Sequence, residues 1–157
     1  MSGPTRQRRK GLEHGFTLME AVLALAIGII LTAMAVPQAR SITKNYRLQG
    51  AVASCTWAIQ STRYQALQQG YPFQVVFSSS AGTYQVQSEP LGATSYSNLG
   101  SAVPISGNSA AINQDTTLQF KPNGAVTATT GTLSFTVTYQ NLTKTITVTN
   151  YGNISVS

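Results

Sequence analysis

Residues 16–36 read FTLMEAVLALAIGIILTAMAV, an apolar run in which Glu20 is the one charged residue. A helix of this length spans about 31 Å, close to the roughly 30 Å hydrocarbon core of a bilayer. Four basic residues precede the run, and such residues are typical of the cytoplasmic flank of a membrane span; they are Arg6, Arg8, Arg9 and Lys10. The run therefore predicts one membrane-spanning helix over residues 16–37, with the C-terminal part of the chain on the opposite side.

Three interpretations of this segment compete. An ordinary secretory signal peptide would use Ala33-Met34-Ala35 as a small-x-small cleavage site, but the run exceeds the usual 7–15 residues and contains a carboxylate. An uncut membrane anchor explains neither Gly15 nor Glu20. The third interpretation uses both residues, as a cleavage position and as a buried acid that needs a partner.

A carboxylate inside an apolar span costs about 2.5–3.5 kcal/mol on insertion scales, so Glu20 is expected to have a partner. After a cut behind Gly15, the new amine of Phe16 lies one helical turn away, and the amine of a neighbouring subunit can approach as well. The alternative is that Glu20 has no partner and extends its carboxylate to the membrane surface, where it is tolerated. Gly28 and Pro37 are weak helix positions, and we expect the segment between them to loosen in a filament.

The stretch Gly15-Phe16-Thr17-Leu18-Met19-Glu20, after the basic Arg8-Arg9-Lys10, resembles the signal of type IV prepilins and type II secretion pseudopilins. Their pattern is a basic leader, a glycine, a phenylalanine, a glutamate as fifth mature residue and an apolar helix. Pro37 stands where many pilins carry a proline. The resemblance implies that a prepilin peptidase cuts after Gly15 and N-methylates Phe16.

The helix is expected to continue over residues 38–70 with one apolar face. Six residues recur at alternating spacings of four and three, which places them on that face: Leu48, Val52, Cys55, Ile59, Thr62 and Ala66. Trp57, Tyr64 and Leu67 fall near its edges. Gly70, followed by Tyr71-Pro72, is a helix stop signal. The lone Cys55 is expected to be a buried apolar group, with an intermolecular disulfide as the alternative.

After Gly70 the apolar residues alternate with period two, which predicts strands. We expect them over residues 73–77, 83–87, 103–105, 117–120, 133–139, 144–149 and 154–156. Residues 90–113 predict a long loop around the short 103–105 strand, and Pro122-Asn123-Gly124 and Asn141-Leu142-Thr143 predict turns. The fold class is therefore α+β: a long N-terminal helix, with a transmembrane first half and an amphipathic second half, packed on an antiparallel β-sheet domain over residues 71–157.

The order of these pieces resembles the GspH/FimT-like minor pilin family. The resemblance rests on Thr62-Arg63 near the helix end, Phe120-Lys121-Pro122-Asn123-Gly124, two Thr-rich strands and a closing Gly-x-Ile. It implies a cleaved leader (1–15), a transmembrane or filament-core helix (16–37) and a periplasmic pilin domain (38–157). It also implies a structural subunit of a type II secretion pseudopilus or a type IV pilus, anchored in the bacterial inner membrane. The implied partners are other pilins or pseudopilins, the assembly platform and the prepilin peptidase.

The two alternative functions are a DNA-binding minor pilin and a membrane-anchored adhesin that uses the 90–113 loop. Many family members close with Gly-Arg-x-Arg, on which DNA binding in some FimT-like members relies, whereas this chain closes with Gly152-Asn153-Ile154-Ser155. Without residues 1–15, the chain has six Lys and Arg residues and three Asp and Glu residues, so its basic excess is small. Nucleic acid is therefore not an expected partner.

The composition argues against an enzyme. Charged residues make up 9% of the chain, against roughly 25% in an average soluble domain. His14 is the one histidine and lies in the predicted leader, so the mature chain has no imidazole for a catalytic set or a zinc site. No phosphate-binding glycine loop is present. We therefore expect no catalytic residues, no metal and no cofactor.

Overall fold

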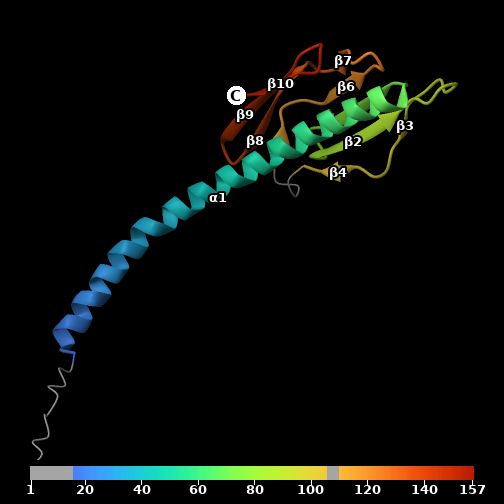
Figure 1. Ribbon diagram of the computed structural model, residues 1–157. Coiled ribbons are helices and arrows are strands. Elements are labelled where there is room, and N and C mark those ends of the chain that lie inside the picture. The colour runs from blue at the N-terminus through green and yellow to red at the C-terminus, as the bar shows by residue number, and fades with distance from the viewer. Residues whose placement is uncertain (1–15, 106–109) are drawn as a thin grey trace, which may run out of the picture. The chain divides into compact units, whose positions relative to one another are not determined.

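The computed structural model describes residues 16–105 and 110–157 (Figure 1). The chain divides into two units, Met1–Ala39 and Arg40–Ser157. Within the described residues, helix α1 (Leu18–Gln69) is followed by strands only, all paired in antiparallel fashion. The predicted α+β class, a long N-terminal helix before antiparallel strands, is thus confirmed.

The apolar face predicted for the second part of α1 is confirmed. All six of its residues are buried, because spacings of three and four keep side chains on one side of a helix. Trp57 and Tyr64 are each 63% exposed, as expected for the edges of that face. The helix ends at Gln69, and Gly70 follows with φ +75°, a left-handed conformation that glycine adopts without a Cβ penalty.

The first sheet has six strands, in the order β3-β2-β1-β6-β7, with β4 also paired to β2. Its central strand β1 buries alternate residues, Phe73, Val75 and Phe77, as its period-two pattern predicts. The strands are β1 (Phe73–Ser78), β2 (Thr83–Ser88), β3 (Ser97–Asn98), β4 (Val103–Pro104), β6 (Thr116–Phe120) and β7 (Val126–Thr130).

The remaining strands form a second sheet of four, in the order β10-β9-β8-β5, a division that the sequence pattern does not predict. Alternation shows that each strand has a buried face, but it does not show which strands share hydrogen bonds, so it cannot separate one sheet from two. The strands are β5 (Ala111–Ile112), β8 (Ser134–Tyr139), β9 (Leu142–Val148) and β10 (Ile154–Val156).

The strands that the sequence did not predict are β3, β5 and β7. β3 and β5 have two residues each, too few for a periodic signal, and β7 buries Val126 alone. The predicted loop 90–113 was therefore too long. The predicted turn at Asn141-Leu142-Thr143 was also misplaced, because Leu142 pairs with Tyr139. The turn residues are Gln140 and Asn141, both with positive φ, which is the signature of a two-residue hairpin turn.

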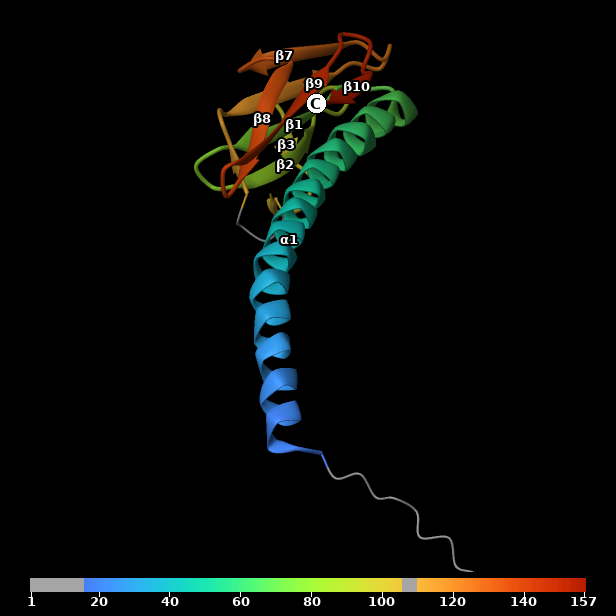
Figure 2. The same ribbon diagram turned by 90° about the vertical axis from the view of Figure 1, so that its left-hand side faces the viewer.

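One hydrophobic core joins α1 to both sheets, and the part of α1 drawn in green lies along them (Figures 1 and 2). Phe77 of the first sheet is fully buried, and its ring centroid lies 6.2 Å from that of Tyr84 and 5.1 Å from that of Phe135. Because Phe135 belongs to the second sheet, this aromatic cluster holds the two sheets together.

A charged contact ties two loops at one end of the first sheet. Asp115 accepts hydrogen bonds from the backbone N–H and the hydroxyl of Ser79, both at 2.7 Å. These donors lower the pKa of the Asp115 carboxyl, since they stabilise its ionised form. The Asp115 carboxylate is therefore ionised at neutral pH and hydrogen-bonded to Ser79.

Replacing Phe77 with alanine should lower the free energy of unfolding by about 3–5 kcal/mol, because a large cavity opens between the two sheets. Urea unfolding of the full chain in detergent micelles, followed by circular dichroism, measures the change. Leu91→Ala is the matched control, since Leu91 is 86% exposed and its loss should change stability by less than about 0.5 kcal/mol. Equal effects of the two substitutions would contradict the placement of Phe77 in the core.

Candidate functional site

The first candidate site is the apolar segment before residue 37. Every side chain from residue 16 to residue 36 is exposed, including Leu25 at 66% and Ile29 at 62%. By length and composition, α1 contains a stretch able to cross a membrane. A continuous apolar surface of this extent is rarely left in contact with water. The segment therefore requires cover from lipid or from other protein.

The start of this segment carries a helix cap that the sequence reasoning missed. The Thr17 hydroxyl accepts a hydrogen bond from the Glu20 backbone N–H at 3.2 Å, just before α1 begins at Leu18. The spacing Thr17-x-x-Glu20 is the signature of a capping box, and this signal was present in the sequence. Glu20 thus lies in the first turn, where the helix dipole favours an acid.

The structure places the predicted residues of this segment as follows. Phe16 is 79% exposed and precedes the helix, and Glu20 lies in its first turn. Gly15, the predicted cleavage position, lies outside the described residues. Gly28 and Pro37 both fall within α1. The loosening of the helix between them in a filament stays a prediction.

Gly28 leaves an open position on the apolar helix. No heavy atom lies within 4 Å of the point where a Cβ would stand, so nothing within the described chain requires glycine there. The carbonyl of Gly28 accepts a hydrogen bond from the Thr32 hydroxyl at 2.7 Å, which satisfies this polar group without water. The position can therefore receive a close-packed neighbouring helix.

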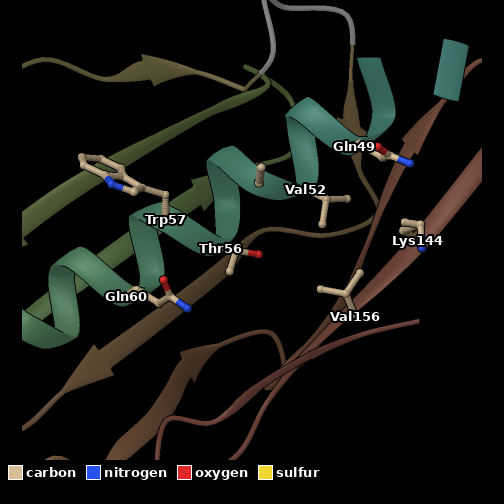
Figure 3. Close-up of a pocket in the computed structure, with 8 residues that line it drawn as sticks. Gln49, Val52, Thr56, Trp57, Gln60, Lys144 and Val156 are labelled. Carbon is tan, nitrogen blue, oxygen red and sulfur yellow. The ribbon is translucent and has the colours of Figure 1, made fainter. Parts of the chain in front are cut away.

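The second candidate site is a groove of about 450 Å³ on the Arg40–Ser157 unit (Figure 3). Figure 3 shows Val52 of α1 facing Val156 of β10, with Lys144 of β9 beside them. The Thr56 hydroxyl oxygen is buried and has no hydrogen-bond partner within the described residues. The lining consists of Gln49, Val52, Ala53, Thr56, Trp57, Gln60, Lys144 and Val156. Its mixture of apolar side chains and amides suits contact with another protein.

The third candidate site is a cleft of about 500 Å³ beside Arg63 of α1. Two loops form its other walls, Asn123–Ala125 between β6 and β7 and Asn150–Tyr151 between β9 and β10. The Val126 N–H donates to the Asn150 carbonyl at 2.8 Å, which holds these loops together. The sequence reasoning noted Thr62-Arg63 and both glycine-containing turns as family features, but it did not bring them together.

Arg63 fits its position only because Gly152 has no side chain. A Cβ on Gly152 would collide with Arg63 Nε and would lie 2.7 Å from Arg63 Cδ. Gly152 is buried and has φ +78°, so glycine is required there both for space and for backbone conformation. The closing glycine of the sequence therefore has a definite structural role.

The described residues offer no group of three or more His, Cys, Asp or Glu side chains able to hold a metal ion. Cys55 is buried and makes no disulfide. Burial raises the pKa of its thiol to about 12, because a thiolate would lack water in the core. The predicted apolar role of Cys55 is confirmed, and its position in the core argues against an intermolecular bridge.

Comparison with known proteins gives one family. Residues 51–152, about two thirds of the chain, match the family model described as type II transport protein GspH. No curated protein and no solved structure shows significant similarity to the chain. The matched range holds residues 51–69 of α1, strands β1 to β9 and the Arg63 cleft, but neither β10 nor the apolar segment.

The thiol of Cys55 should be almost unreactive in the folded chain at pH 8. A pKa about three units above the usual value leaves about 1000-fold less thiolate, and the core blocks the reagent. The rate of reaction with a disulfide reagent, measured with and without denaturant, tests this. The contribution of the protonated Cys55 thiol to the free energy of unfolding is present below pH 9 and is lost as the pH rises through about 12. Fast labelling of the native chain would contradict the burial of Cys55.

Proposed function

The chain belongs to the GspH family of type II transport proteins, and on this premise we propose that it is a pseudopilin, a structural subunit of a secretion filament. In this proposal a prepilin peptidase removes residues 1–15 and methylates the amine of Phe16. The mature chain is held in the inner membrane by its apolar helix. It then leaves the membrane by packing that helix against the helices of other subunits.

The observation that carries the proposal is the uncovered apolar helix. All side chains over residues 16–36 are exposed in the single chain, although the second part of the same helix buries a full face in the core. Lipid covers this surface in the membrane, and a bundle of identical segments covers it equally well in a filament. One helix that suits both surroundings is what transfer from membrane to filament requires.

Glu20 supplies the specificity that apolar packing lacks. Apolar helices slide past one another at little cost, whereas a carboxylate in apolar surroundings needs a cation at a definite place. Thr17 caps the helix so that Glu20 stands in its first turn, one turn from the amine that cleavage would create at Phe16. An amine–carboxylate pair, within one chain or between neighbours, fixes the register of the helices.

The globular unit has surfaces for the remaining contacts. The groove beside Trp57 and Val156 and the exposed edges of α1 are suited to neighbouring pseudopilins and to the assembly platform. A type IV pilus would use the same helix in the same way, and the family match favours the secretion system. The role is structural and requires no catalysis.

Replacing Gly15 with leucine should leave the full-length precursor in the membrane. A peptidase that cuts beside the bilayer has to accept the residue before the cut, and a bulky side chain there should block it. Mass spectrometry of the wild-type chain should show a mature form that begins at Phe16 and carries one added methyl group. A mature form that begins after Ala35 would identify an ordinary signal peptide and would end the pseudopilin proposal.

Replacing Glu20 with alanine should preserve membrane insertion and cleavage, since an acid is removed from the span and Gly15 is unchanged. Incorporation into filaments should fall by at least about tenfold, because the amine of Phe16 becomes an unpaired charge among packed helices. The ratio of filament-associated to membrane-associated mature chain measures the effect.

Two further variants separate the charge of Glu20 from its place in the helix. Glu20→Gln keeps the shape but not the charge, and it should assemble as poorly as Glu20→Ala. Thr17→Val removes the cap hydroxyl and keeps Glu20, so it should reduce assembly far less. Normal assembly of the cleaved Glu20→Ala chain would show that Glu20 has no part in subunit packing.

A further inference from the structure

Arg63 carries a charge that the described chain leaves unpaired. Its guanidinium makes no hydrogen bond or ion pair with the residues that the structure describes, and its Nε is buried without a partner. An unpaired cationic donor in a partly buried position is unfavourable, and proteins normally give it an acceptor. The cleft beside Arg63 is where an acceptor from outside can reach it.

The two turns around Arg63 hold its side chain in place. Gly152 lies against Nε and Cδ, and a Cβ on Gly124 would stand 3.9 Å from Nη2. Since Nε is buried and Arg63 still lines the cleft, the accessible edge of the guanidinium is the one that bears its Nη groups. A guanidinium already fixed in position loses little conformational entropy when it binds a ligand.

The rest of the lining offers further hydrogen-bond donors and no acid. The Asn123 side-chain oxygen accepts the Ala125 N–H at 3.1 Å, so its NH₂ group is left to donate. Asn150 adds a second amide, and Tyr151, 81% exposed, forms an aromatic wall. The full lining is Arg63, Asn123, Gly124, Ala125, Asn150 and Tyr151. A planar anion is the ligand that such a set of donors selects.

The acids of the described chain are engaged elsewhere. Asp115 accepts two hydrogen bonds from Ser79, Glu89 interacts with Tyr96, and Glu20 lies in the apolar segment. Among the described residues no acid lines the cleft, so we assign the anion to another molecule. A nucleic acid backbone is a poor fit, because its closely spaced phosphates call for several cations and Arg63 is the one that lines the cleft.

We propose that the Arg63 cleft is a carboxylate-binding site that receives a glutamate or aspartate side chain of a partner protein. The Nη edge of Arg63 pairs with the carboxylate, and the amides of Asn123 and Asn150 contact the partner around it. Gly152 serves this site because a side chain there would collide with Arg63. The proposal does not rest on filament assembly, since binding to the single chain would stand if the filament role failed.

The test uses the full chain with ¹⁵N-labelled arginine, in micelles of an uncharged detergent. The guanidinium resonances are followed by NMR while a blocked peptide Gly-Glu-Gly is added, and the Arg63 signals are assigned from Arg63→Lys. We expect saturable shifts of the Arg63 signals with the glutamate peptide. The same peptide with glutamine in place of glutamate should bind at least about tenfold more weakly, as loss of a charge-assisted hydrogen bond predicts.

Matched variants locate the site. Arg63→Gln removes a positive charge from the cleft, and Gly152→Ala displaces the guanidinium without changing any charge; each should weaken peptide binding at least about tenfold. Lys44→Gln removes one exposed charge outside the cleft and should change binding less than about twofold. Circular dichroism of each variant checks its folding. The glutamine-peptide comparison needs no variant and stays decisive if Arg63→Gln unfolds.

Three results would overturn the proposal. Equal binding of the glutamate and glutamine peptides would show that no carboxylate is recognised. Inorganic phosphate that binds more tightly than the glutamate peptide would assign the cleft to a different anion. Acetate that binds as tightly as the peptide would show that the cleft has no preference for a protein side chain.

Discussion

The apolar surface of residues 16–36 has no cover within the described chain, and the rest of the molecule is organised around this fact. Burial of apolar surface lowers the free energy by about 25 cal/mol per Å², so a segment of this size is strongly disfavoured in water. Lipid and neighbouring helices are the two covers available to it. Glu20 lies in its first turn, and in the proposed filament it would make the second cover selective, because a carboxylate in apolar surroundings needs a cation.

The second part of α1, unlike the first, is covered by the rest of the chain. Its buried face, from Leu48 to Ala66, joins a core shared by two sheets, and Phe77 and Phe135 meet across them. This unit has its own core, so it can remain folded while the apolar segment changes its surroundings. Arg63 lies where the helix, the β6–β7 turn and the β9–β10 turn come together. Any partner that binds there contacts the helix and both turns.

The sequence predicted the features that depend on local periodicity. The buried face of α1 and the long strands β1, β2, β8 and β9 follow from residue spacing, and the end of the helix follows from the stop signal at Gly70. The division into two sheets did not, because pairing between strands depends on long-range packing that alternation does not encode. The cap at Thr17 is indicated by the Thr17-x-x-Glu20 spacing, a local signal that hydrophobic periodicity does not include. The contact between Arg63 and Gly152 joins residues far apart in sequence, and only the fold brings them together.

The central claim is that the same apolar helix surface is covered first by lipid and then by other subunits. The direct measurement is fluorescence quenching of a label at Ile29, introduced through Ile29→Cys in a Cys55→Ser background, with a quencher carried on lipid chains. We predict strong quenching in the membrane fraction and at least about fivefold less in purified filaments, since helices within 8–10 Å of one another exclude lipid. Equal quenching by lipid in both fractions, or quenching by a water-soluble reagent in filaments, would contradict the claim.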